Sequence, residues 1–569
     1  MKNNAEVRMQ NDELKREPDS NAPRSVFALL SSLSFFLLLA CLCYYSILNS
    51  YFLSDDFVQV GRVLGGDWSL AWGREHGGFF RPLFIASYIV DSRVWGERPF
   101  GYHLTNALLH GLNSYLVYRL GLLLLRSQKL SEESARRVSL AAGLLFLLHP
   151  SHTEAVSWIS GRADLLAALF CLAALLLYVF YVENRRAPYL LLALISFALA
   201  LLSKEAAASL PFIIFAFGVY LSAAEEKRRA PLLRALKTSV LFFAVLLLFL
   251  LLRRVWLGAW LGGYGAEQHL NFSPGWIRDR FLQATLRAVV PAAPAELSEI
   301  LLKPLKSAVF ILVALVFMTL VLLLLRRRRH SEEKAARHLQ NKLVLLLAVS
   351  FVLSLLPVIS LRLSLFDTQG ERFIYWPSVF TCLLISHLGV VLIKWRRWRL
   401  LLLACILVFY SVSLYRTNQR WREAGETARR IKEELALGAS GEESLIVINA
   451  PDNLRGVPVF HNGLQEALSG FQKSGPKREV RLLSLHSIQS VADGAELKME
   501  GDRFTLRLTN RSDVFTKVAD TTPCFEVQER FPDALSFRLR GCPPRAALFF
   551  FNSGSMYRVI ARQENGAGR

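Results

Sequence analysis

The chain has 569 residues, of which 53% are apolar and only 20% are charged. Its 67 Lys and Arg exceed its 46 Asp and Glu, which gives a formal net charge of +21. This composition excludes an intrinsically disordered chain, a collagen-like chain and a disulfide scaffold. A basic nucleic-acid-binding protein would not need apolar runs such as residues 241–252 (LFFAVLLLFLLL). We therefore expect membrane lipids and no nucleic acid as partners, and a polytopic membrane protein.

Residues 1–25 are polar, and we interpret them as a disordered cytoplasmic tail. The apolar run at 26–49 is too long for a signal-peptide core, so it is interpreted as an uncleaved first span. Further spans, each close to the ~20 residues that cross a bilayer, are predicted near 103–125, 138–157, 161–182, 187–203, 206–222, 238–257, 306–325, 343–361, 375–393 and 400–415. The predicted fold class is a polytopic α-helical membrane protein with about 11 transmembrane helices.

Basic residues concentrate in alternate connections between these spans, as in residues 126–137, 227–237 and 326–342. Positive charge marks the cytoplasmic side, so the N-terminus is predicted to lie inside and the C-terminal region outside. The predicted location is the bacterial inner (plasma) membrane. Loops 50–102 and 258–305 would then face the periplasmic or external side.

Residues 416–569 are expected to form an extracytoplasmic domain of α/β or mainly β type. Short β-rich runs such as 445–449 (LIVIN) alternate there with turn residues. Tetratricopeptide repeats are not apparent. Cys524 and Cys542 are the cysteines of this region, and an oxidising compartment favours a disulfide between them over two free thiols.

Charged groups inside or beside membrane spans are costly, and are by default functional or paired. Asp55 and Asp56 follow the first span directly. Such a pair can supply a general base and a group that orients the acceptor. The alternative is an interfacial turn with a helix-capping Asp.

A second polar group consists of His149, His152 and Glu154 around Pro150, where we expect the chain to break at membrane depth. These side chains could bind a divalent cation. Their spacing does not match the helical His-Glu-x-x-His pattern, which favours a hydrogen-bond network instead. Arg162 follows this group.

Three further polar groups sit at the predicted outer ends of spans. Lys204 could hold an anionic headgroup or pair with its neighbour Glu205. Arg253 and Arg254 could clamp a phosphate or extend to the interface, and Glu371-Arg372 enters the tenth span. A transporter would be expected to carry polar groups at the midplane and on both sides.

The motifs follow one another in a characteristic order. They are Asp55-Asp56, Phe80-Arg81-Pro82-Leu83, Gly101-Tyr102-His103-Leu104-Thr105-Asn106, His149-Pro150-Ser151-His152-Thr153-Glu154, Gly161-Arg162-Ala163-Asp164, Ser203-Lys204-Glu205 and Glu371-Arg372-Phe373-Ile374-Tyr375-Trp376-Pro377. Together they resemble the transmembrane region of the TPR-containing O-mannosyltransferases, in the GT-C glycosyltransferase superfamily. The resemblance covers roughly residues 27–415, and the region after it departs from that family.

The resemblance implies that residues 26–415 are a GT-C-like catalytic domain. Its activity would be transfer of a sugar, mannose in that family, from a polyprenyl-phosphate donor to an acceptor hydroxyl, with inversion. The acceptor could be a protein, a lipid or a glycan. No cofactor is implied with certainty, and a divalent cation remains open.

The resemblance points to Asp55 as the general base, with Asp56 as its partner. The available stabilisers of the departing phosphate are Arg162, Lys204, Arg253, Arg254 and Arg372. The substrate-binding surface would also include His149, His152, Glu154, Glu205 and Glu371. A flippase or transporter for polyprenyl-linked sugars, without transferase activity, is the alternative, and a sensor or adhesin-like scaffold is a third class.

Overall fold

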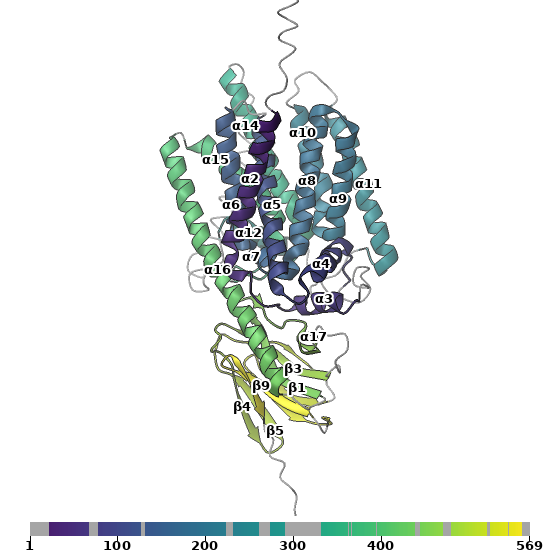
Figure 1. Ribbon diagram of the computed structural model, residues 1–569, viewed down its shortest axis with the longest axis vertical. Helices are drawn as coiled ribbons and strands as arrows, with labels where there is room; N and C mark the ends of the chain where they lie inside the picture. The colour runs from purple at the N-terminus through teal and green to yellow at the C-terminus, as the bar shows by residue number, and fades with distance from the viewer. Residues whose placement is uncertain are drawn as a thin grey trace, which may run out of the picture.

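The computed structural model consists of a helical bundle joined to a smaller β-rich domain (Figure 1). It describes residues 22–559 except 68–77, 127–130, 224–230, 261–272, 291–331, 362, 366, 394, 439–443, 470–478, 520–523 and 544–545. The predicted fold class, a polytopic helical protein with a β-rich C-terminal region, is confirmed.

Ten of the eleven predicted spans contain a helix. These helices are α2 (Ala22–Cys43), α5 (Pro99–Arg126), α6 (Glu132–Leu147), α8 (Arg162–Asn184), α9 (Ala187–Ser203), α10 (Leu210–Ala223), α11 (Pro231–Leu257), α14 (Glu332–Leu355), α15 (Tyr375–Leu392) and α16 (Arg396–Gly438). The span predicted at 306–325 lies outside the described residues. Within the described ranges, seven helices are long and apolar enough to cross a bilayer, and two shorter apolar helices accompany them. The count of 11 is therefore not established.

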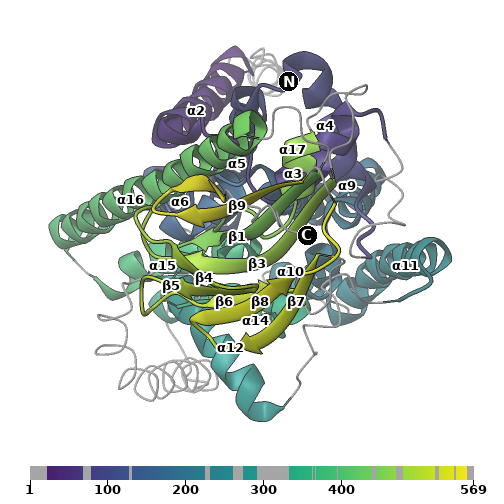
Figure 2. The same ribbon diagram turned by 90° about the horizontal axis from the view of Figure 1, so that it is seen from below.

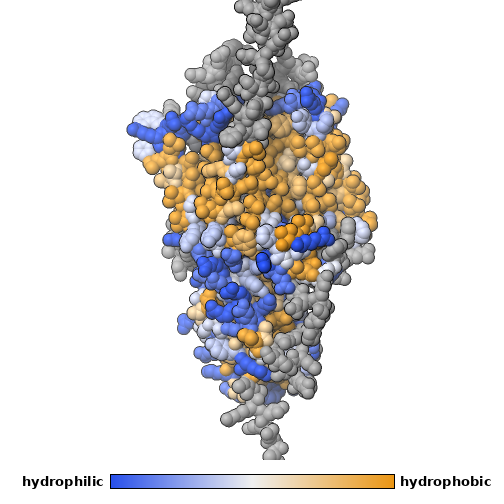
Figure 3. All heavy atoms as spheres, viewed as in Figure 1, coloured by the Kyte–Doolittle hydropathy of each residue, from blue (hydrophilic) through white to orange (hydrophobic). Residues whose placement is uncertain are grey.

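An apolar belt crosses the visible face of the bundle, between a hydrophilic end and the more hydrophilic β-rich domain (Figure 3). Large apolar side chains such as Leu191, Leu247 and Val408 are exposed. Water would not stabilise so much exposed apolar surface, but the hydrocarbon of a bilayer would.

The chain breaks at Pro150, as predicted. Helix α6 ends at Leu147, and the short turns η3 (Pro150–His152), α7 (Thr153–Val156) and η4 (Ile159–Gly161) follow before α8 begins. Proline lacks an N–H and cannot continue a helix. The irregular backbone is buried inside the protein, the setting in which a membrane tolerates it.

Two short helices of the first loop lie between the bundle and the β-rich domain (Figure 1). They are α3 (Asp55–Leu64) and α4 (Pro82–Trp95), and Pro82 occupies the first turn of α4, where its missing N–H costs nothing. The predicted loop at 258–305 contains α12 (Pro274–Arg287).

Helix α16 connects the two parts of the molecule as one continuous helix of 43 residues. No break marks residue 415, where we placed the end of the last span. Residues 416–438 continue toward the β-rich domain, where Ile431 and Leu435 are buried and Glu434 Oε2 accepts a hydrogen bond from Met556 N (2.6 Å).

The β-rich domain contains two sheets (Figure 2). The larger has the order β10-β9-β1-β3-β6, with β2 paired to β1, and the smaller has the order β4-β5-β8-β7. The strands are β1 (Ser444–Leu454), β2 (Val457–Pro458), β3 (Glu479–Ile488), β4 (Ala495–Glu500), β5 (Arg503–Leu508), β6 (Phe515–Val518), β7 (Phe525–Arg530), β8 (Ala534–Leu539), β9 (Ala546–Asn552) and β10 (Ser555–Val559). Strand β1 runs parallel to both β3 and β9, so the larger sheet is mixed. Apolar side chains such as Ile446 and Phe504 fill the space between the sheets.

Cys524 and Cys542 form a disulfide in this domain, with Cα atoms 4.6 Å apart. We predict that replacing both by Ser lowers the free energy of unfolding of the domain by about 2–4 kcal/mol, since the bond restricts the unfolded chain. Urea-dependent proteolysis of the full chain in detergent measures this change. Cys405→Ser, at an exposed thiol of α16, is the control. Equal stability of the double variant and the control would contradict the prediction.

The charge pattern predicts that the connection between α8 and α9 lies opposite the β-rich domain across the membrane. Cysteines introduced at Asn184 and Glu496, both exposed, should therefore react with a membrane-impermeant thiol reagent from opposite sides. The background would lack the five free cysteines and keep the disulfide. Reaction of both from one side would overturn the predicted topology.

Candidate functional site

The two carboxylates after the first span occupy different environments. Asp56 is buried, and its carboxylate accepts hydrogen bonds from Leu53 N (3.1 Å), Ser160 N (2.9 Å) and Ser160 Oγ (2.5 Å). Burial raises the pKa of Asp56 to about 7, against the opposing effect of these hydrogen bonds. Asp56 therefore ties α3 to the turn that precedes α8.

Asp55 is only partly buried at the start of α3. Its Oδ1 accepts a hydrogen bond from Asn462 Nδ2 (2.7 Å), a side chain of the β-rich domain. Among the described residues, Oδ2 has no recorded partner. Asp55 is thus the carboxylate of the pair that remains accessible to a substrate.

The segment Val459–Gly463 holds the β-rich domain against α3, and we call it the docking segment. Ser54 N donates to Val459 O (2.9 Å), and Asn462 N donates to Ser54 Oγ (3.2 Å). The rings of Phe57 and Phe460 stack with centroids 5.8 Å apart. Helix α17 (Leu464–Ser469) follows and lies beside α3 (Figure 2).

Two predicted phosphate-binding cations are buried in ion pairs at this end of the bundle. Arg162 is 0% exposed, and its Nη2 lies 2.6 Å from Asp91 Oδ2, while its Nε donates to Asn106 Oδ1 (2.8 Å). Lys204 is 3% exposed, and its Nζ lies 2.5 Å from Asp164 Oδ2. Lys204 therefore pairs with Asp164 and not with Glu205.

The other pairs join segments far apart in the sequence. Glu205 accepts two hydrogen bonds from Arg81, at 3.0 and 2.5 Å. Glu154 accepts from the backbone N of Arg372 (2.8 Å) and from its Nη1 (2.5 Å). Glu371 pairs with Arg287. Arg81 and Arg372 keep 15% and 24% of their side chains exposed, more than Lys204 or Arg162.

Arg253 and Arg254 separate at the end of α11. Arg253 is buried and its Nη2 donates to Gly78 O (2.8 Å), which places it beside the segment that carries Arg81. Arg254 is exposed and donates to Gly258 O. The structure does not bring Arg254 to the other cations, and it supports the alternative of extension to the interface for this residue.

His149 and His152 bind separate partners. His149 Nε2 contacts Ala288 O (3.0 Å), and His152 Nε2 contacts Ser378 Oγ (2.8 Å), while the two rings stack. Glu154 is engaged by Arg372. Within the described ranges, no group of three or more His, Cys, Asp or Glu has a metal-holding arrangement. The geometry matches the hydrogen-bond network that we favoured.

Sequence reasoning did not identify four members of these pairs as site residues: Arg81, Asp91, Asp164 and Arg287. Arg81 belongs to the motif Phe80-Arg81-Pro82-Leu83, so a role in the site could have been inferred from the sequence. Asp91 carried a usable signal, because it is the acid of the mostly apolar helix α4. Asn462 carried no signal, since nothing local connects it with residue 55.

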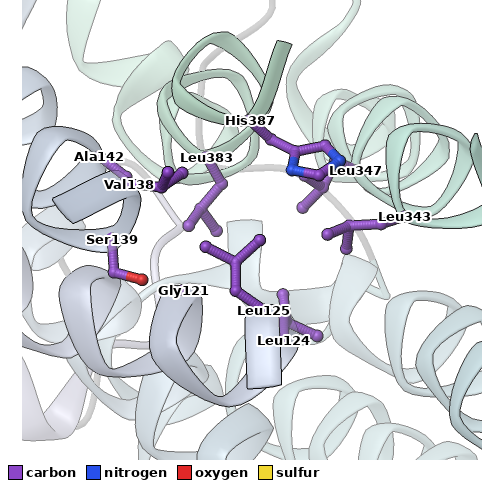
Figure 4. A pocket seen from close by; sticks show the side chains of 10 residues that line it. All are labelled: Gly121, Leu124, Leu125, Val138, Ser139, Ala142, Leu343, Leu347, Leu383 and His387. Atoms are coloured by element: carbon purple, nitrogen blue, oxygen red, sulfur yellow. The ribbon is translucent and has the colours of Figure 1, made fainter. Parts of the chain in front are cut away.

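A small cavity of about 10 Å³ lies near the other end of α5, which begins at the site with Pro99. Leu124, Leu343, Leu383 and His387 are among the residues that line it (Figure 4). Its size is about that of one water molecule. We assign it no role in the site.

The docking segment depends on Gly463, which has φ +83° and whose added Cβ would lie 2.6 Å from Ser54 O. We predict that Gly463→Ala accelerates amide hydrogen exchange in residues 54–58 and 459–463, because the segment must move. Gly501→Ala is the matched control: φ is +63° there, and nothing lies within 4 Å of an added Cβ. Both variants carry similar backbone strain. The same exchange rates in the two variants would contradict the prediction.

Residues 88–256 match the family model described as dolichyl-phosphate-mannose-protein mannosyltransferase. The chain is 37% identical over 185 residues to Protein O-mannosyl-transferase Tmtc1 of Drosophila melanogaster, covering 30% of this chain and 20% of that protein. It is 31% identical over 204 residues to Tmtc3 of the same organism, covering 31% and 22%. The matches thus span about a fifth of the length of these relatives.

The crystal structure of ArnT from Cupriavidus metallidurans in the apo state is similar at 14% identity and a TM-score of 0.44, over 80% of this chain and 90% of that chain. Similarity this loose is no basis for inferring a shared activity. The sequence matches bear out the resemblance drawn from the motifs: the chain resembles the transmembrane region of the TMTC-type O-mannosyltransferases.

Proposed function

We propose that the protein is a membrane glycosyltransferase that moves a sugar from a polyprenyl-phosphate-linked donor to an acceptor hydroxyl. The observation that carries the proposal is the partly exposed Asp55 beside Asp56, which is buried and accepts three hydrogen bonds. Paired cations lie at the same end of the bundle. The sequence similarity to O-mannosyltransferases supports this class of reaction and makes mannose the first sugar to test.

Asp55 would act as the general base. Its carboxylate takes the proton of the acceptor hydroxyl while the oxygen attacks the anomeric carbon. The bond from that carbon to the phosphate oxygen breaks, and the electron pair leaves on the lipid phosphate. Attack opposite the leaving group inverts the configuration. Asp56 would keep α3 in place and would not take the proton.

Arg81 and Arg372 are the cations that we propose for the departing phosphate. They retain exposed surface, whereas Arg162 and Lys204 are enclosed with their carboxylate partners. The carboxylates Glu205 and Glu154 hold the two guanidinium groups in fixed orientations. Preorganised charge of this kind stabilises a developing anion without reorganisation during the reaction.

A flippase without transferase activity is the competing function. It would need polar groups along a path through the bundle. The charged pairs described above join α4, α7, the first turn of α8 and neighbouring turns, which gather at the end facing the β-rich domain (Figure 1). This one-sided arrangement favours a reaction at that end of the bundle over a transport path through it. The charge pattern predicts that this end faces the outer side of the membrane.

We predict that Asp55→Asn reduces sugar transfer by ~10²–10⁴-fold, because the amide cannot accept the proton of the hydroxyl. The measurement uses purified full-length protein, polyprenyl-phosphate mannose and related donors, and a panel of hydroxyl acceptors. Circular dichroism and thermal unfolding establish that the variant is folded.

Asp56→Asn is the matched control, and we expect a smaller loss of rate. Its amide retains one acceptor oxygen for Ser160 but faces Leu53 N with a donor, so thermal stability should fall more than it does in Asp55→Asn. Full activity in the Asp55→Asn/Asp56→Asn double variant would contradict catalysis by this loop.

A further inference from the structure

A hollow of about 290 Å³ lies in the β-rich domain directly beside the docking segment. Its wall is formed by residues 460–466, by part of β3, and by Lys517 and Ala519. Leu464, Leu483 and Leu485 supply apolar surface, while His461, Glu466 and Lys517 supply charge. The volume is near the lower end of the range for small-ligand sites.

The hollow is adjacent to the proposed catalytic position, and the two share Asn462. This residue lines the hollow and also donates from Nδ2 to Asp55 Oδ1 (2.7 Å). His461 is the adjacent residue. A molecule seated in the hollow would therefore lie next to the carboxylate that we propose as the base.

His461 is oriented by a buried carboxylate. Its Nδ1 lies 2.8 Å from Asp452 Oδ1; the His461 side chain is 63% exposed, and that of Asp452 is 6% exposed. The described residues provide no recorded partner for Nε2. Because Nδ1 is fixed by Asp452, a protonated ring offers Nε2–H as a free donor to the hollow.

The surroundings favour the protonated ring. The hydrogen bond to Asp452 raises the pKa of His461 above its ordinary value, with smaller contributions from the charges of Asp452 and Asp55, while burial and Lys517 oppose the shift. These groups belong to β1, α3 and β6, the elements packed around the ring. Among the residues that line the hollow, the protonated ring and Lys517 are two cations beside the carboxylate of Glu466, while Asp452 and Asp55 act on the ring from outside this lining.

We propose that the hollow is the acceptor site, and that His461 and Lys517 bind an acidic group of the acceptor so that its hydroxyl reaches Asp55. Charge-assisted hydrogen bonds from Nε2–H and from the ammonium group would hold the carboxylate or phosphate oxygens. The apolar floor would accept the carbon face of the same molecule. This inference rests on the proposed function for the reaction, but its binding step can be measured separately.

The test measures binding of matched probes to the full-length protein in zwitterionic nanodiscs by ligand-observed NMR. The pairs are methyl glucuronide with methyl glucoside, and glycerol 3-phosphate with glycerol. For at least one pair we expect the acidic member to bind about tenfold tighter, the effect of roughly one charge-assisted hydrogen bond. The preference should fall as pH rises through the pKa of His461, because the ring loses its proton.

The His461→Gln/Lys517→Gln variant should lose the preference and its pH dependence. Glu466→Gln, on the same rim, should keep or enlarge the preference, and Glu496→Gln, on an exposed part of β4, should match the wild type. Lack of preference in the wild type for both pairs, or the same preference in the double variant, would overturn the inference.

The transfer assay separates this outcome from failure of the proposed function. One outcome is that the wild type transfers sugar and the double variant uses acidic and neutral acceptors in the same ratio as the wild type. This outcome would overturn the acceptor site alone. Acid-selective binding by a wild type that neither transfers sugar nor hydrolyses the donor would overturn the proposed function, and with it the acceptor role of the hollow.

Discussion

A charged side chain at membrane depth is stable only when an opposite charge and further hydrogen bonds replace the water it loses. This constraint organises the end of the bundle where the site lies. Glu154 and Arg372 are 218 residues apart, and Arg81 and Glu205 are 124 apart, yet each pair closes a bidentate contact. Each contact holds together two segments that are far apart in the sequence. The ion pairs that compensate for buried charge therefore also position the loops.

The same principle explains the unequal roles of Asp55 and Asp56. Asp56 is buried, and three hydrogen bonds engage both of its carboxylate oxygens. Its pKa of about 7 shows that burial is only partly offset. Within the described part of the chain, Asp55 instead receives one bond, from a residue of the β-rich domain. A partly exposed carboxylate that is oriented by one donor suits proton transfer better than one that is buried and engaged at both oxygens.

Much of the fold could be predicted from the sequence, because hydropathy and charge act locally. The apolar runs located ten described helices, and Pro150 predicted the break before α8. The pairing of charges could not be predicted, since partners are set by how helices pack. Lys204 and Glu205 are neighbours in the sequence, yet they turn to Asp164 and Arg81 respectively. Arg253 and Arg254 differ only by helix phase, which buries one and exposes the other.

The similarity to the mannosyltransferase family and the proposed acceptor site fall in different parts of the molecule. The matched residues 88–256 contain Glu154 and Glu205, the carboxylates that hold the proposed donor cations Arg372 and Arg81, while the two cations themselves lie outside the matched residues. Asn462, His461 and Lys517 belong to the β-rich domain, beyond the matched region. A lipid-phosphate donor presents similar chemistry to many transferases, whereas acceptors differ widely. If the docking segment orients Asp55 as proposed, the membrane region and the β-rich domain must act together, because the base belongs to one and its hydrogen-bond donor to the other.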